Sequence, residues 1–169
     1  VNGLPTLFYS PFDVAFLRVD GQITVRTSSD DDLIGFAIGF RPGDATNPNA
    51  DYLLIDWKKR SQSYNFGSPS CTPGTTCPAG LAVSRVEGVP TADELWGHVD
   101  LDASACQGPS GRVTELARAN SLGSTGWVTN QTYSFRFDFS PTRLDVYVDG
   151  FLELSVTGTF QNGRMAFYN

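Results

Sequence analysis

The chain is 169 residues long, which suits a single domain spanning residues 1–169 with a core of its own. Charged residues make up only 18% and the net charge is −6, while glycines and aromatic residues are plentiful. This balance is typical of an all-β secreted protein, and it argues against binding to nucleic acid or anionic membranes, which require basic surfaces. No apolar run has the length that spans a membrane, and Val1–Ser10 lacks the pattern of a signal peptide.

The sequence before residue 30 predicts two strands. Leu7–Tyr9 is a short strand that ends at Ser10-Pro11. From Val14 to Thr27 apolar and polar residues alternate, as in a strand with one buried face. Asp20-Gly21 within this stretch is either a hairpin turn or a bulge in one long strand. The alternation resumes directly after it, which favours the bulge.

The stretch Leu33–Phe40 is a run of apolar residues interrupted only by Gly35 and Gly39. A short run of this kind without helical spacing predicts a strand buried on both faces. Because its glycines have no side chain, another segment is able to lie close against the strand. The apolar run Tyr52–Lys58 predicts the next strand, and a hairpin of the two would form the middle of a sheet.

The rest of the chain contains more short strands separated by turn residues. Thr132–Phe139 alternates most clearly, with four aromatic residues on one face, and Asp149-Gly150 predicts a hairpin turn. Thr91 and Glu94 have the spacing of a capping box, which predicts a turn or two of helix. Further strands are predicted at Leu81–Val86, Arg112–Ala117, Arg143–Val148, Phe151–Val156 and Arg164–Tyr168. Many short strands with almost no helix predict an all-β sandwich or jelly roll.

The three cysteines bear on the redox environment. Cys71 and Cys77 lie in a polar, turn-rich loop, and a disulfide between them is the favoured pairing. Cys106 is the odd cysteine, and it is able to replace either partner. A zinc site needs more ligands than these cysteines and the single histidine, His98, provide. A disulfide implies an oxidising compartment.

Asp30, Asp31 and Asp32 stand directly before the central strand. Adjacent carboxylates repel one another, and a calcium ion bound among them reverses that repulsion. The alternative is a solvated turn, in which aspartate is common, and the residues alone leave both interpretations open. Strand alternation points Asp30 and Asp32 to one side and Asp31 to the other, so that not all three need be ligands. Candidates for further ligands are Asp44, Asp100 and Asp102.

A second candidate site lies around Asp56, Trp57 and Tyr64. In a functional interpretation Trp57 or Tyr64 is a stacking platform for sugars on a concave sheet face, and Asp56 bonds their hydroxyls. In the alternative, Trp57 lies in the core and Asp56 pairs with Lys58 on the other face of the strand. The core interpretation is favoured for Trp57, and the role of Asp56 stays open.

Enzymatic activity is not expected. Glucan hydrolases with a jelly-roll fold need two carboxylates at a defined separation, typically in the pattern Glu-x-Asp-x-x-Glu along one strand. No predicted strand carries this pattern, and Glu115 and Glu153 stand alone on theirs. The sequence contains neither a nucleophile elbow nor a phosphate-binding glycine loop.

Several segments, taken in order, resemble the thrombospondin C-terminal domain. Ser29–Phe36 is similar to that domain's T-D-D-D-[YF]-[AI]-G-F element, and Asp51–Lys58 to its F-Y-V-V-M-W-K-Q strand. Further similar segments are Ser61–Tyr64 (T-Q-S-Y), Leu95–His98 (L-W-H-T), Gly111–Val113 with Gly126-Trp127, and Gly163–Phe167 (G-G-R-L-G-[VL]-F). Asp56 departs from the pattern, because it replaces an apolar residue. The calcium-binding repeats that precede the domain in thrombospondins are absent from this chain, and the lack of animal-style disulfide positions suggests a distant, bacterial relative.

The resemblance implies a legume-lectin (concanavalin) type jelly roll of two antiparallel sheets. It also implies Ca²⁺ at the loops, with Asp30–Asp32 as ligands, and an extracellular adhesion role. We therefore expect a secreted, non-catalytic, calcium-binding adhesion or lectin-like module whose partner is a glycan, a matrix or surface protein, or copies of itself. Two alternatives remain: a structural module of an extracellular filament or surface layer, and a carbohydrate-binding appendage of a polysaccharide-degrading enzyme.

Overall fold

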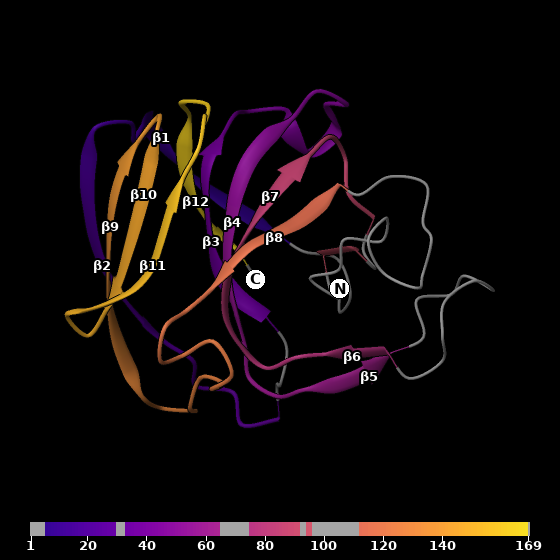
Figure 1. Cartoon of the computed structure of the whole chain (residues 1–169), viewed down its shortest axis with the longest axis vertical. Helices are drawn as coiled ribbons and strands as arrows, with labels where there is room; N and C mark the ends of the chain where they lie inside the picture. Colours follow the sequence, from indigo (N-terminus) through magenta and orange to yellow (C-terminus); the bar gives the residue numbers. More distant parts are fainter. Residues whose placement is uncertain (1–5, 30–32, 65–74, 92–93, 96–111, 169) are drawn as a thin grey trace.

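The computed structural model describes residues 6–29, 33–64, 75–91, 94–95 and 112–168. This part of the chain is a sandwich of two antiparallel sheets with a small extra hairpin (Figure 1). Its strands are β1 Leu7–Asp13, β2 Leu17–Thr24, β3 Leu33–Phe40, β4 Asp51–Lys58, β5 Gln62–Tyr64, β6 Thr75–Cys77, β7 Gly80–Glu87, β8 Val113–Arg118, β9 Thr132–Ser140, β10 Arg143–Val148, β11 Phe151–Thr157 and β12 Arg164–Tyr168.

The larger sheet has the strand order β1-β12-β3-β4-β7-β8, and the smaller sheet has the order β11-β10-β9-β2. Among the described residues, strands β5 and β6 pair only with each other, and a 3-10 turn, η1 Asp44–Thr46, follows β3. The arrangement confirms the prediction of an all-β, two-sheet antiparallel jelly-roll sandwich. No helix in the described ranges is long and apolar enough to cross a membrane.

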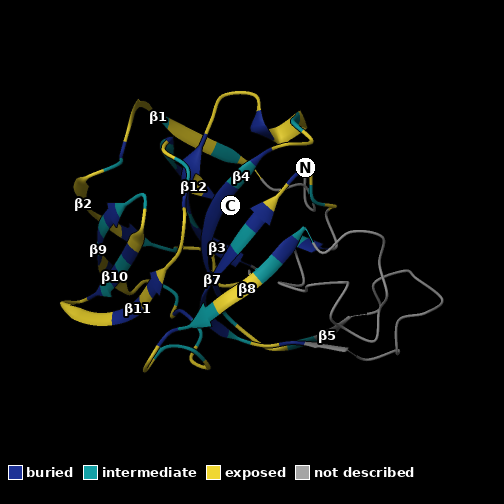
Figure 2. Ribbon diagram, turned by 45° about the horizontal axis from the view of Figure 1, so that its top comes forward, coloured by how far each residue is buried: buried dark blue, intermediate teal, exposed yellow. Residues whose placement is uncertain are grey.

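Strand β3 lies in the middle of the six-stranded sheet and is buried on both faces, as its sequence predicts (Figure 2). It pairs with β4 in the expected hairpin. Gly35 explains the close fit of the two strands, because a Cβ atom there would lie only 2.0 Å from the carbonyl oxygen of Ile55. The glycine in this strand is therefore a packing requirement.

The main core lies between the sheets. Tyr133, Phe135, Phe137 and Phe139 of β9 all point into it, which confirms the alternation seen in the sequence. A second apolar cluster covers the opposite face of the six-stranded sheet and includes Tyr52. The hairpin turn between β10 and β11 is also confirmed, since Asp149 and Gly150 both have positive φ angles.

Two details of the first strands differ from the prediction. Strand β1 does not end at Ser10-Pro11 but continues to Asp13, with a shift in register after Tyr9. A proline is tolerated there because β1 is an edge strand. Strand β2 pairs with β9 through Asp20 and Gly21 without any shift in register, so that this segment is one strand with neither a hairpin nor a bulge.

The predicted capping box is present. The backbone N–H of Thr91 donates to the Glu94 carboxylate at 2.6 Å, and the N–H of Glu94 donates to Thr91 Oγ1 at 3.2 Å. Glu94 is fully buried and also accepts a hydrogen bond from the backbone N–H of Arg112 at 3.3 Å. One carboxylate thus ties the short helical turn to the chain that leads into β8.

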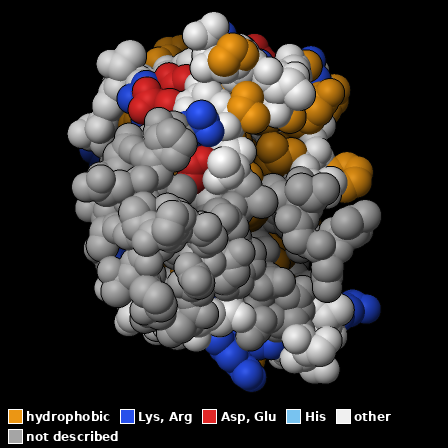
Figure 3. Space-filling model, turned by 90° about the vertical axis from the view of Figure 1, so that its right-hand side faces the viewer, with side chains coloured by type: hydrophobic (Ala, Val, Ile, Leu, Met, Phe, Trp, Pro, Cys, Tyr) orange, Lys and Arg blue, Asp and Glu red, His pale blue; other side chains and the backbone are white. Residues whose placement is uncertain are grey.

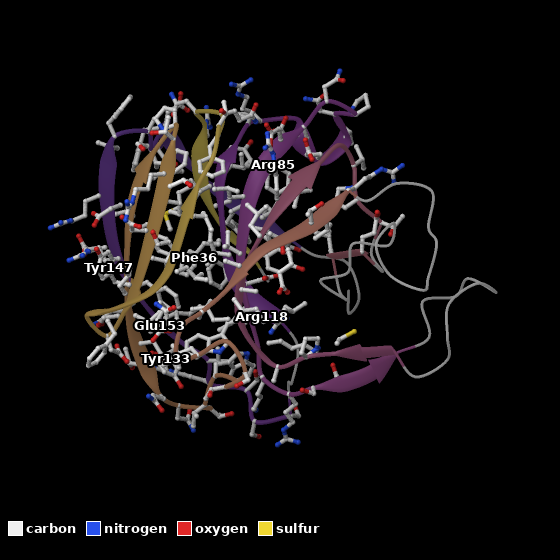
Figure 4. All side chains as sticks on the ribbon, in the orientation of Figure 1. Phe36, Arg85, Arg118, Tyr133, Tyr147 and Glu153 are labelled. Carbon is white, nitrogen blue, oxygen red and sulfur yellow. The ribbon has the colours of Figure 1, made fainter. Side chains whose placement is uncertain are left out.

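The two long sides of the sandwich differ. On one side the buried Glu153 of β11 accepts hydrogen bonds from the backbone N–H groups of Ser121 and Leu122, in the segment that follows β8 (Figure 4). These bonds hold the β8 end of one sheet to the β11 edge of the other. On the opposite side, the four-stranded sheet ends at β2, while β12 and β1 complete the edge of the larger sheet.

Candidate functional site

The predicted calcium ligands Asp30, Asp31 and Asp32 lie outside the described residues. Their suggested partner Asp44 follows β3, whereas they precede it, and an eight-residue strand spans about 23 Å. Both carboxylate oxygens of Asp44 are also engaged, by the N–H of Arg41 at 2.8 Å and by Asn47 Nδ2 at 3.0 Å. Asp44 therefore serves its own loop rather than the predicted calcium site.

Within the part of the chain that the structure describes, no group of three or more His, Cys, Asp or Glu side chains is placed to hold a metal ion. Asp100 and Asp102, the other suggested ligands, lie outside that part. Calcium binding by Asp30–Asp32 stays a prediction.

Trp57 lies in the core between the sheets and is only 1% exposed. Its Nε1–H donates to the carbonyl oxygen of Thr125 at 2.6 Å, and its ring centroid lies 4.6 Å from that of Tyr133. The indole thus has no open face on which a sugar could stack. This confirms the interpretation of Trp57 as a core residue. Tyr64 belongs to β5, but its side chain lies outside the described residues.

Asp56 is buried on the face of β4 that points away from the four-stranded sheet. Lys58, two residues further on, lies on the same face, is also buried, and donates from Nζ to Gln62 Oε1 at 2.5 Å. Asp56 therefore contributes to a polar zone that is enclosed within the fold.

Cys77, in β6, is buried and forms no disulfide within the part of the chain that the structure describes. Burial raises the pKa of this thiol, and the nearby charge of Lys58 offsets part of the effect. Cys71 and Cys106 lie outside the described residues, so that the predicted Cys71–Cys77 disulfide stays a prediction.

A different set of side chains comes together on the outer face of the four-stranded sheet. Arg18 of β2 lies opposite Asp138 of β9, which lies opposite Asp145 of β10, which lies opposite Ser155 of β11. One row of polar residues therefore crosses all four strands. Figure 4 shows Tyr147 of β10 on this same side, away from the six-stranded sheet.

Each carboxylate of this row is held by arginine. Arg18 Nε donates to Asp138 Oδ1 at 2.9 Å, and Arg136 Nε lies 3.3 Å from Asp138 Oδ2. Arg143 Nε donates to Asp145 Oδ2 at 2.8 Å. The second oxygen, Asp145 Oδ1, is buried, and no hydrogen bond of good geometry reaches it from the described residues. Because this oxygen is closed to solvent, a ligand would meet Asp145 through Arg143, which the carboxylate holds in place.

The charges of this face are fixed over a wide pH range. Burial raises the pKa of Asp145, but the hydrogen bonds from Arg143 and Ser155 and the positive charges of Arg143 and Arg136 outweigh burial and hold it below its ordinary value. The hydrogen bond to Asp145 in turn raises the pKa of Arg143. Both partners are therefore ionised at neutral and mildly acidic pH.

Phe16 stands at the rim of this row in an unusual conformation. It belongs to a turn closed by the N–H of Leu17, which donates to the Val14 carbonyl at 3.1 Å, and its own N–H donates to the Phe139 carbonyl at 2.9 Å. These bonds hold Phe16 at φ 60, in the left-handed region that bulky residues avoid. Its side chain is 81% exposed, so that core packing does not account for it.

Phe16 and the arginine–aspartate pairs enclose a shallow hollow of about 570 Å³. We call this the outer hollow; its lining includes Phe16, Arg18, Asp138, Arg143 and Asp145. It combines one exposed aromatic ring with fixed charges of both signs. These are the groups that recognise a ligand with apolar faces and several hydroxyls.

The sequence analysis missed this site. The alternation of β9 did place Arg136 and Asp138 opposite the aromatic face, but it does not show which residues of other strands lie beside them. Arg18 and Asp138 are 120 positions apart in the chain. The one local signal was the pair Phe16-Leu17. Two adjacent apolar residues interrupt the alternation predicted for this segment, so that one of them must face outward.

The fold and this hollow define an all-β jelly-roll protein with a polar surface site. No family model and no curated protein matches the chain. The resemblance to the thrombospondin C-terminal domain is therefore not confirmed.

Among solved structures, the chain is similar to the carbohydrate-binding module CBM66 from Bacillus subtilis, with a TM-score of 0.60 and 11% identity over 98% of this chain and 73% of that one. Two κ-carrageenases also match, from Pseudoalteromonas carrageenovora (TM-score 0.41, 9% identity) and Zobellia galactanivorans (0.46, 11%). Each match covers 96% of this chain but only about half of the carrageenase, 52% and 53%. At these identities the likeness shows the fold alone.

Proposed function

We propose that this chain is a non-catalytic carbohydrate-binding module and that the outer hollow binds the glycan. This was an alternative from the sequence, and the likeness to a carbohydrate-binding module supports it over the adhesion role. The observation that carries the proposal is the exposed ring of Phe16, held in a strained conformation beside two arginine–aspartate pairs. Strained residues of this kind concentrate at ligand sites, where binding compensates for their cost.

The chemistry of the hollow suits a sugar. A sugar ring has an apolar face of C–H groups, which packs on the face of Phe16, and hydroxyls around its rim. The exposed guanidinium groups of Arg18 and Arg143, which Asp138 and Asp145 hold in place, donate to the sugar's oxygens. Arg136 is stacked on Tyr147, with Cζ 3.5 Å from the ring centroid, which keeps the floor beside the hollow rigid.

The charges favour a neutral glycan over a sulfated or uronic one. Three arginines of this face, Arg18, Arg136 and Arg143, are balanced by Asp20, Asp138 and Asp145. With a net charge of −6, the whole chain also repels polyanions. Binding should therefore change little between about 50 mM and about 0.5 M salt, since it does not depend on screened long-range attraction.

The proposal is tested with an array of neutral and anionic oligosaccharides, followed by affinity electrophoresis in gels that contain the polysaccharide that binds. We expect the wild-type chain to bind a neutral glycan and Asp145→Asn to lose most of that binding. Asp51→Asn is the matched control, because it removes the partner of Arg85 from an ion pair of 2.7 Å on the other sheet (Figure 4).

Three results would overturn the proposal. They are the absence of any glycan binding on the array, retention of full affinity by Asp145→Asn, and an equal loss of affinity in Asp51→Asn. The last result would show that the effect of Asp145→Asn comes from general destabilisation rather than from the hollow.

A calcium-stabilised adhesion module, secreted and without catalytic activity, is the second candidate. The similarity of Ser29–Phe36 to the T-D-D-D-[YF]-[AI]-G-F element of the thrombospondin C-terminal domain motivates it, because that resemblance implies calcium at the loops. In this case Ca²⁺ bound by Asp30–Asp32 would order the loops around β3, and the outer hollow would bind a glycan of a matrix or cell surface. The chelation experiment described in the Discussion tests the metal separately from the glycan.

A further inference from the structure

A second hollow lies on the opposite side of β2, within the sandwich, and it differs in character from the outer hollow. It opens where the four-stranded sheet ends at β2 while β12 and β1 extend the six-stranded sheet further. Register places Phe36, Phe167 and Phe8 side by side on β3, β12 and β1. Exposure rises along this row from the partly buried Phe36 to 37% for Phe167 and 74% for Phe8.

This edge groove has a volume of about 250 Å³ and an almost wholly apolar lining. Its walls include Phe12, Val19, Phe36, Met165 and Phe167, and none of the described residues that line it is charged. Figure 3 shows hydrophobic side chains gathered along one margin of the molecule, and Phe12 is itself 56% exposed.

Gly21 leaves the groove open. It lies on β2 between Val19 and Ile23, which both pack toward the core, so that a side chain at position 21 would point the same way. A Cβ atom at Gly21 would meet no other atom within 4 Å. The backbone there is not in the left-handed region, so the glycine is not required by the conformation of the strand.

We propose that the edge groove is a binding site for a small, neutral aromatic ring. An apolar cavity of about 150 Å³ is large enough to hold benzene, so that this groove has room for one substituted ring. The rings of Phe12, Phe36 and Phe167 offer edges and faces to such a guest, and Met165 offers its thioether. A charged ligand would lose its hydration without gaining a partner. The proposal does not depend on the glycan site.

The experiment uses Met165, which is the single methionine of the chain and lies in the wall of the groove. With ¹³C-methyl methionine its methyl group gives one NMR signal, which is followed during titration with toluene. We expect a saturable upfield or downfield shift caused by the ring current of the bound toluene. Benzoate, which has the same ring with a charge, should cause no saturable shift.

Two variants locate the ligand. Gly21→Leu fills the groove and should abolish the saturable shift, whereas Gln22→Leu adds a similar side chain to the exposed face of the same strand and should leave it unchanged. Circular dichroism and thermal melting show that both variants are folded.

The proposal is overturned if toluene gives no saturable shift up to its solubility limit, or if Gly21→Leu binds it as well as the wild type does. It is also overturned if pentane binds as tightly as toluene, because the groove would then not select an aromatic ring, or if benzoate binds equally well.

Discussion

Replacing Phe16 by glycine separates binding from stability, because the two contributions of this residue have opposite signs. At φ 60 a residue other than glycine costs about 1–2 kcal/mol, which the change releases. Full burial of a phenylalanine is worth about 1.5–3 kcal/mol. Because the ring of Phe16 is 81% exposed, its loss costs only a few tenths of a kcal/mol. The added freedom of glycine in the unfolded chain costs about 0.5–1 kcal/mol.

Together these contributions keep the free energy of unfolding of Phe16→Gly within about 1 kcal/mol of the wild-type value, and we expect a small increase. For comparison, truncation of a core phenylalanine costs about 3–5 kcal/mol. Affinity for the glycan should fall about thirtyfold or more, since an aromatic anchor contributes about 2 kcal/mol or more to binding. Urea denaturation gives the first quantity and affinity electrophoresis gives the second.

Asn130→Gly is the control for the backbone effect. Asn130 has φ 64 and also lies in a turn, but asparagine tolerates this conformation and its side chain is not part of the outer hollow. We expect the control to change neither stability nor affinity appreciably. If Phe16→Gly lost about 3 kcal/mol of stability, or bound the glycan with unchanged affinity, the ring would be a packing element and the reasoning would be wrong.

Three other predictions concern the frame around the sites. Gly35→Ala should destabilise the fold by about 3 kcal/mol or more in urea titration, because its Cβ would meet Ile55 O at 2.0 Å, whereas Gly21→Ala should change stability by less than about 1 kcal/mol. If residues 30–32 bind calcium, excess chelator should lower the melting temperature and added Ca²⁺ should restore it; an unchanged melting curve would contradict the prediction. If Cys77 forms the predicted disulfide, mass spectrometry after alkylation of the unfolded, unreduced chain should show a single modified cysteine, and three would exclude the bond.

The parts of the fold that were predictable are those set by burial along one strand. The continuous apolar run of β3 and the alternation of β9 each describe how one segment meets the core, and both were assigned correctly. The predicted end of β1 was wrong. Pro11 has no N–H to donate, and this ends a strand only where a neighbouring strand would need that hydrogen bond. That is known only once β1 is found at the sheet edge. The bulge proposed at Asp20-Gly21 failed for a similar reason, since only the unbroken pairing with β9 shows that none is needed.

The outer hollow was not predictable in the same way, because it depends on register between strands far apart in the sequence. Arg143 and Asp145 are close along the chain and were available as a pair, but Arg18 and Phe16 reach them only through β2 and β9. By contrast, the core interpretation that the sequence favoured for Trp57 is confirmed, because the structure buries it between the sheets. Phe16 became a candidate for the proposed glycan site only through its position in space.

Stability does not account for the charged row on the four-stranded sheet. The side chains of Arg18 and Arg143 are 60% and 55% exposed, and ion pairs in such positions are screened by solvent and add little to folding. The apolar inner faces of β9 and β10 would pack equally well beneath simple polar residues, because the row lies on the outside of the sheet. If the proposed glycan binds at the outer hollow, these fixed guanidinium and carboxylate groups beside the exposed ring of Phe16 orient it there. The effect of Asp145→Asn should accordingly be larger on glycan affinity than on stability, which is the reverse of what a purely structural ion pair would show.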